Sequence, residues 1–322
     1  MTNEEKNKAK MVFESLCSLL DAHKWLTRKN EEELSVDCDA QGEDLPMAIT
    51  VRVDAEMQLI QLVSHLPFVV AEEQRLEVAI AVAVINKKLP DGNFEYDFHN
   101  GNLFFRMTTS FIESEVSNGV FAYLLMVSFT TIEKYNDKFF MLGRGAISLE
   151  DFISESYSSG KVEKTTVDIE KQVLAKRVFE DLCLALERKG WSYKTHEEML
   201  VVTCSVSGAD IPMGLILIVD AERQLLKVLS RLPFTVPEDK RMELAVAACV
   251  ATFGLADGNF DYDVAKGTID FRLTAVFGES KIGEGLFTYL VEFSSSVVDR
   301  YNDRFLALCK GLISIDAFIL KG

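Results

Sequence analysis

The sequence repeats itself, and the repeating unit is as long as a whole domain. Short phrases of the first half return in the second at a constant offset of about 166 positions, with no gap needed between residues 12 and 153. The phrases include Leu66-Pro67-Phe68 with Leu232-Pro233-Phe234, Asp91-Gly92-Asn93-Phe94 with Asp257-Gly258-Asn259-Phe260, and Tyr135-Asn136-Asp137 with Tyr301-Asn302-Asp303. A solenoid repeats every roughly 20–50 residues, so this longer period predicts two copies of one fold.

Each copy is long enough to bury a core of its own. The stretch from Ser154 to Lys161 is rich in serine and has no apolar periodicity, which is typical of a linker. We therefore expect a first domain over residues 1–155, a linker over 156–168 and a second domain over 169–322.

Charge and composition narrow the class of protein. The 322 residues include 34 Lys and Arg against 50 Asp and Glu, a formal charge of −16, and 48% are hydrophobic. This balance predicts a soluble globular protein and disfavours nucleic acid or an anionic membrane as a partner, because both require a basic surface. No apolar secretory segment follows the first residues and the six cysteines form no CxxC pair, so we expect a cytoplasmic protein with reduced thiols.

One uncharged stretch, residues 116–132, is about 17 residues long and therefore at the short limit for a membrane-spanning helix. The second copy has Glu292 where the first has Met126. Because a carboxylate is costly in the middle of hydrocarbon, the pair predicts a core helix in both copies.

Apolar periodicity predicts the elements of each copy. Thr2 and Glu5 have the spacing of a capping box, and Phe13, Leu16, Cys17 and Leu20 share one helical face. Alternation predicts strands near residues 34–38, 47–53 and 59–63, with Pro67 ending the third, then a helix over 72–89, a hairpin of strands at 94–98 and 103–111, a long helix over 119–142 and a short helical piece at 148–153. The fold class is α+β: two tandem α-β-β-β-α-β-β-α copies with mainly antiparallel sheets, packed as a pseudo-dimer.

Two phrases within this order resemble a known family. Leu-Pro-Phe precedes a helix that carries Glu72 and Arg75, and Asp-Gly-Asn-Phe-x-Tyr-Asp precedes Phe105-Arg106. Their order and spacing in both copies resemble the YbjN family of bacterial proteins. The resemblance implies a role in sensory transduction and a fold similar to class I type III secretion chaperones, which are small acidic proteins that dimerise and hold the unfolded region of a cargo protein. It implies here two such modules in one chain.

Residue types that carry chemistry do not form a recognisable constellation. His23, His65, His99 and His196 have no histidine at the matching position of the other copy, and no nucleophile motif surrounds them. Asp91, Asp97 and Arg106 recur as Asp257, Asp263 and Arg272, and we interpret Asp97 and Arg106 as an ordinary cross-strand ion pair. No glycine-rich phosphate loop or Cys/His cluster is present, so we expect no catalytic, cofactor or metal site.

Six residues are candidates for a protein-binding or inter-domain surface: Phe104, Met126, Ile216, Ile218, Tyr135 and Tyr301. The first four are apolar where alternation or the other copy predicts exposure, and the two tyrosines recur late in the long helix. An interface between the copies is favoured over an external partner for the first four, and simple core packing over docking for the tyrosines.

The function expected from these observations is that of a non-enzymatic protein-binding module, chaperone-like or regulatory, whose copies pack on each other. One alternative is a sensory regulator that binds a small ligand between the copies. Another is an enzyme with one degenerate copy. The identity of a protein partner is left open, and neither nucleic acid nor a membrane is expected as a partner.

Overall fold

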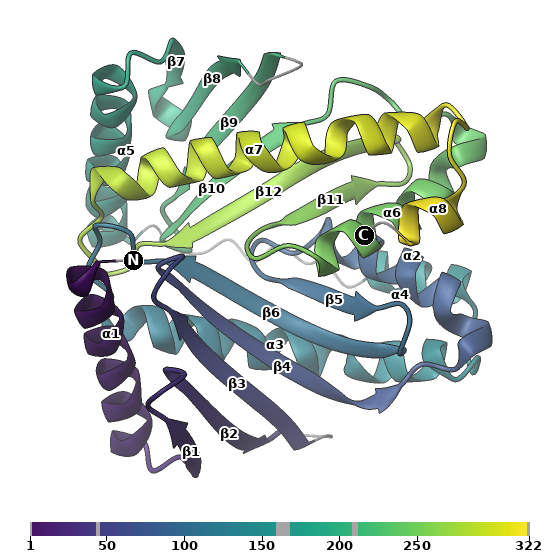
Figure 1. Cartoon of the computed structure of the whole chain (residues 1–322), viewed down its shortest axis with the longest axis horizontal. Helices are drawn as coiled ribbons and strands as arrows, with labels where there is room; N and C mark the ends of the chain where they lie inside the picture. The colour runs from purple at the N-terminus through teal and green to yellow at the C-terminus, as the bar shows by residue number, and fades with distance from the viewer. Residues whose placement is uncertain (1, 43–45, 159–167, 208–211, 321–322) are drawn as a thin grey trace.

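A computed structural model describes residues 2–42, 46–158, 168–207 and 212–320. The chain forms two similar halves, each built on a six-stranded antiparallel sheet (Figure 1). The predicted α+β class, the antiparallel sheets and the repetition of one unit are thereby confirmed. The central part of the expected linker, residues 159–167, lies outside the described residues.

The first half begins with helix α1 (Asn3–Ala22), which has the predicted capping box: Thr2 Oγ1 accepts from the Glu5 amide, and Glu5 accepts from the Thr2 amide. Its other helices are α2 (Arg75–Asn86), α3 (Asn118–Gly143) and α4 (Leu149–Ser158). Its strands are β1 (Thr27–Asn30), β2 (Ser35–Gln41), β3 (Pro46–Asp54), β4 (Leu59–Val69), β5 (Asn93–Asp97) and β6 (Asn102–Ser110).

The sheet order is β1-β2-β3-β4-β6-β5, and two features of it differ from the sequence prediction. The edge strand β1 was not predicted, because its residues are polar and do not alternate. The prediction that Pro67 ends the third strand is wrong in the first half, since β4 continues to Val69. The ladder to β6 shifts register between His65 and Val69, which accommodates a residue that has no amide hydrogen.

The second half repeats this order. Its helices are α5 (Ile169–Arg188), α6 (Arg241–Phe253), α7 (Glu284–Cys309) and α8 (Ile315–Ile319). Its strands are β7 (Tyr193–His196), β8 (Val201–Ser207), β9 (Pro212–Asp220), β10 (Leu225–Arg231), β11 (Asn259–Asp263) and β12 (Thr268–Val276), in the order β11-β12-β10-β9-β8-β7. Here the strand does end before the proline, as predicted.

The long helices lie on opposite sides of the molecule: α7 crosses the second sheet on the side facing the viewer, and α3 crosses the first sheet behind it (Figure 1). The halves meet where the C-terminal ends of β6 and β12 converge, and α2 packs against α6 (Figure 1). Buried apolar side chains of both halves form one continuous core cluster. Within the described residues, no helix has the length and apolar character needed to cross a membrane.

Candidate functional site

The junction between the halves contains two buried arginines in matching positions. Arg106 of β6 forms an ion pair with Glu95 at 3.0 Å and donates from Nη2 to the carbonyl oxygen of Gly258, also at 3.0 Å, and from Nη1 to the carbonyl oxygen of Leu255. Arg272 of β12 pairs with Asp261 at 3.0 Å and donates to the carbonyl oxygen of Gly92 at 3.1 Å. Each half therefore inserts an arginine that pairs with a carboxylate of its own half and donates to backbone carbonyl oxygens of the other half.

This geometry corrects the interpretation of Asp97. The hairpin register places Asn93 opposite Arg106 and Asp97 opposite Asn102. Asp97 instead accepts backbone hydrogen bonds from His99 and Asn100, so the expected Asp97–Arg106 pair does not form. The anion that meets Arg106 is Glu95, which is 7% exposed. Burial raises the pKa of Glu95 to about 7, although Arg106 opposes the shift.

The recurring aspartates also join the halves. Thr108 Oγ1 donates to Asp257 at 2.5 Å, and Thr274 Oγ1 donates to Asp91 at 2.6 Å. Tyr289 donates to the second oxygen of Asp257 at 2.8 Å. Burial raises the pKa of Asp257, and burial together with Asp257 raises the pKa of Tyr289. Both carboxylates are almost completely buried at the junction, where each accepts a hydrogen bond from a threonine of the other half.

The other side chains that could act in catalysis or metal binding lie apart from one another. All four histidines are exposed. Within the described segments, no three His, Cys, Asp or Glu side chains are grouped closely enough to hold a metal ion. The cysteines are reduced in the structure, and burial raises the pKa of Cys183, which weakens its thiolate character.

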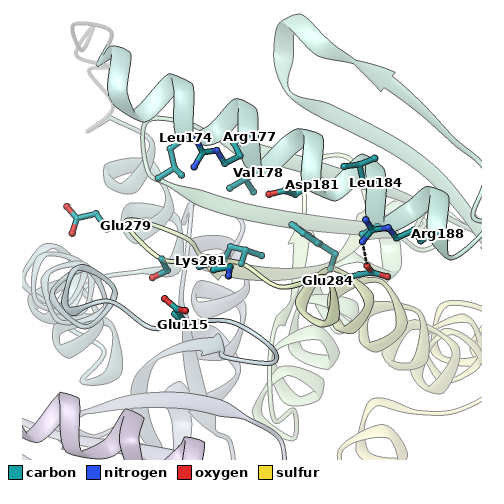
Figure 2. A pocket seen from close by; sticks show the side chains of 14 residues that line it. Glu115, Leu174, Arg177, Val178, Asp181, Leu184, Arg188, Glu279, Lys281 and Glu284 are labelled. Atoms are coloured by element: carbon teal, nitrogen blue, oxygen red, sulfur yellow. Dashed lines mark hydrogen bonds and ion pairs between the residues drawn. The ribbon is translucent and has the colours of Figure 1, made fainter.

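A cavity of about 680 Å³ opens between α5 and the segment that begins α7, next to Glu115 of the first half. Figure 2 shows Arg177, Asp181 and Arg188 of α5 across from Lys281 and Glu284, with Arg188 and Glu284 joined by an ion pair of 2.7 Å. Cations and carboxylates alternate around the cavity. It therefore offers no concentrated positive charge for a phosphate, although Val178, Ile282 and Phe287 add apolar surface between the charged groups.

A second, more apolar groove of about 940 Å³ lies between α5 and the β7–β8 region, and we call it the α5 groove. Its floor and walls include Phe179, Cys183, Leu200, Val173, Leu184 and Tyr193. Val173 is 60% exposed and Leu184 is 47% exposed. Glu180, Glu197 and Glu198 line it too, with Lys176 as a cation, so its border is mainly acidic.

The six surface candidates fall in four different environments. Phe104 stacks on Phe253 of the other half with ring centroids 6.3 Å apart. Met126 lines a cavity of about 590 Å³ between α3 and the beginning of α5. Ile216 and Ile218 lie on the sheet face away from α5 and α7, where Ile216 is 40% exposed. Tyr135 and Tyr301 are buried in the two cores, in edge-to-face contact with Phe94 and Phe260.

Sequence reasoning missed the α5 groove and the arginine–carbonyl contacts. The sequence signal for the groove was that polar residues of the first copy are replaced by less polar ones in the second. Asn7, Ser18 and Thr27 correspond to Val173, Leu184 and Tyr193. The signal for the arginine–carbonyl contacts was Arg106 standing among buried strand residues in both copies. A buried arginine requires a counter-charge and hydrogen-bond acceptors. Arg106 has its counter-charge, Glu95, in its own half and its carbonyl acceptors in the other half.

Comparisons with known proteins give one family match. No curated protein matches the sequence. Among solved structures, the di-domain ARO/CYC BexL from the BE-7585A biosynthetic pathway aligns over 94% of each chain at 12% identity with a TM-score of 0.16, a likeness too low to inform the fold. The family model of YbjN, described as "Putative bacterial sensory transduction regulator", matches residues 13–141. Residues 13–141 of this chain are therefore a YbjN domain.

Proposed function

We propose that the chain is a non-enzymatic protein-binding module, chaperone-like or regulatory, whose two halves act as an intramolecular dimer. The observation that carries the proposal is the α5 groove, where the second half exposes apolar side chains at positions that are polar in the first half. Exposed apolar surface of this kind is typical of a binding site, because it is destabilising unless another surface covers it.

The chemistry of the groove specifies its occupant. Val173, Leu184 and Tyr193 favour apolar side chains, and the carboxylates of Glu180, Glu197 and Glu198 favour cations beside them. An extended or helical segment with alternating apolar and basic residues meets both demands. The strongly acidic chain as a whole would also accelerate the approach of such a segment.

The absence of enzymatic activity is part of the proposal. The buried carboxylates Asp91 and Asp257 are held by threonines of the opposite half, and Glu95 by Arg106. These groups support the junction, and their burial keeps them away from a substrate in solution.

Selection of random twelve-residue peptides on the immobilised full chain tests the proposal. We expect enrichment of sequences that combine apolar and basic residues, and at least tenfold weaker binding to the Val173→Asn, Leu184→Ser variant, which carries the first half's residues. Ile216→Thr is the matched control, because it makes the same kind of replacement on the sheet face, and it should bind like the wild type. Equal binding to all three proteins, or no enrichment, would reject the α5 groove as the site.

A sensory regulator that binds a small ligand between the halves is the second candidate, and the cavity at Met126 supports it. Tyr123, Met126 and Leu174 give this cavity an apolar wall drawn from both halves. Met126→Glu introduces the residue that the second copy has at this place. If a library of small metabolites raises the melting temperature of the wild type but not of this variant, the ligand-binding function replaces the protein-binding one.

A further inference from the structure

The contact between α2 or α6 and the opposite sheet occurs twice, once with charged and once with aromatic residues. On one side Lys87 pairs with Asp270 at 2.8 Å, and Arg231 pairs with the same carboxylate at 2.7 Å. At the matching positions on the other side, Phe253 stacks on Phe104 at 6.3 Å, and His65 meets Phe104 edge-on at 4.8 Å. The three pairs of matching positions, Lys87 with Phe253, Asp270 with Phe104 and Arg231 with His65, occupy equivalent places in the two halves. Their side chains differ completely in chemistry.

A pairing of one half with a copy of itself would mix these two chemistries. Two first halves would place Lys87 against Phe104 at both contacts, and two second halves would place Phe253 against Asp270. Asp270 is only 2% exposed, and Arg231 and Lys87 together keep its pKa low although burial alone would raise it. In a pair of second halves this carboxylate would lose Lys87 and gain a ring.

A separate contact distinguishes the two halves by the size of one side chain. The carbonyl of Glu113 lies so close to Gly283 that a Cβ there would overlap it and would come within 2.8 Å of the carbonyl carbon. The counterpart of Gly283 is Ser117, whose hydroxyl donates to the carbonyl oxygen of Gly278 at 2.9 Å. Two first halves would bring Ser117 against Glu113 at the spacing that Gly283 has here, which is too short for a Cβ.

We propose that the junction surface of each half fits the other half and excludes a copy of itself, so that neither two first halves nor two second halves pair with each other. This goes beyond the proposed function, because it assigns the partner of the junction surface and not of the α5 groove. A single long interface that is chemically and sterically different at its two ends discriminates between partners by mismatch as well as by attraction.

The test uses an exchange variant of the full chain, in which four residues trade places: Lys87→Phe, Phe253→Lys, Ser117→Gly and Gly283→Ser. Its composition equals that of the wild type, but matched contacts now form between like halves and mismatched ones within the chain. Two differently tagged copies are co-expressed, and the fraction that co-purifies is measured together with the sedimentation coefficient. We expect at least a tenfold rise in co-purification over the wild type.

Two further variants make the outcome unambiguous. Gly283→Ser alone breaks the pairing within the chain without permitting first halves to pair, so it should lower the melting temperature and leave co-purification at the wild-type level. The milder Ser117→Gly, Gly283→Ser pair replaces the exchange variant if that chain aggregates. An exchange variant that stays monomeric and as stable as the wild type, or that loses stability without associating, would overturn the proposal.

Discussion

Arg106 in the first half donates to the carbonyl oxygen of Gly258 in the second half at 3.0 Å, while its charge is balanced by Glu95 of its own half. Arg106 is therefore a residue of the first half's sheet whose guanidinium is hydrogen-bonded to the backbone of the second half. Its side chain is almost completely buried, so a substitution that removes the guanidinium should measurably change the stability of the junction.

Arg106→Met should lower the free energy of unfolding by about 3–5 kcal/mol, since it leaves Glu95 buried without its cation. Urea unfolding followed by circular dichroism measures the loss. Arg28→Met is the control, because Arg28 forms its ion pair with Asp39 on the surface and its removal should leave the unfolding midpoint unchanged. Equal effects of the two substitutions would mean that the Arg106 pair has no special role.

The raised pKa of Glu95 predicts that the stability of the fold depends on pH. Its pKa in the folded chain is about 7, above the ordinary value of 4.5, so the folded state holds a proton that the unfolded state releases. The contribution of Glu95 to stability is therefore complete below about pH 4.5 and is lost as the pH rises to about 7, by roughly 3 kcal/mol. Relative to the wild type, Glu95→Gln should gain stability between pH 5 and pH 8.

The opposite sign is expected at Asp97, which provides the control for that titration. Burial alone would raise its pKa, but hydrogen bonds from Asn100 and His99 keep it below the ordinary value. Asp97 therefore stabilises the fold above pH 4, and this contribution is lost as the pH falls through its folded-state pKa. A parallel response of Asp97→Asn and Glu95→Gln between pH 5 and 8 would contradict the assignment of the pH dependence to Glu95.

Gly258 should tolerate no side chain. It has a φ of +71°, and a Cβ would lie 2.7 Å from the carbonyl oxygen of Arg272. Gly258→Ala should cost about 3 kcal/mol or more, as the sum of a left-handed backbone and an overlap with Phe271 and Arg272 of the neighbouring strand β12. Gly190 has a φ of +69° and open space around it, so Gly190→Ala isolates the backbone part at about 1 kcal/mol. Similar losses at both glycines would show that the junction can relax.

Ile216 should be replaceable without loss of stability. It is 40% exposed on the sheet face, and its counterpart in the first half is Thr50. Ile216→Thr should therefore change the free energy of unfolding by less than about 0.5 kcal/mol, because a β-branched side chain is retained on an exposed strand position. Thermal unfolding checks this, and a decrease of several degrees would identify the face as part of the packed core.

Elements with a strong local pattern could be predicted from the sequence. The helices α1, α3 and α7 and the hairpin β5–β6 follow from apolar spacing and turn residues, and the structure reproduces them within a few positions. The strands β1 and β7 were missed because they have no buried face and lie at sheet edges, where each pairs with one neighbour, β2 or β8. Their place is set by the sheet and not by their own residues.

The junction could be predicted only in outline, for a different reason. The partners of Arg106 are Glu95 and two carbonyl oxygens about 150 positions away, which no local pattern reveals. The hairpin turn also shifts the register so that Asp97 faces Asn102. The repeat itself was sufficient to predict two halves, but not which side chains of each half enter the other.

Glu113 accepts a hydrogen bond at 2.8 Å from the amide of Gly285, in the first turn of α7. During synthesis the ribosome releases Glu113 long before Gly285 exists, so the newborn first half displays its side of the junction to the cell with nothing to cover it. The interval before the second half emerges is thus the period when this protein is most exposed to misassembly, and its length is fixed by the speed of translation.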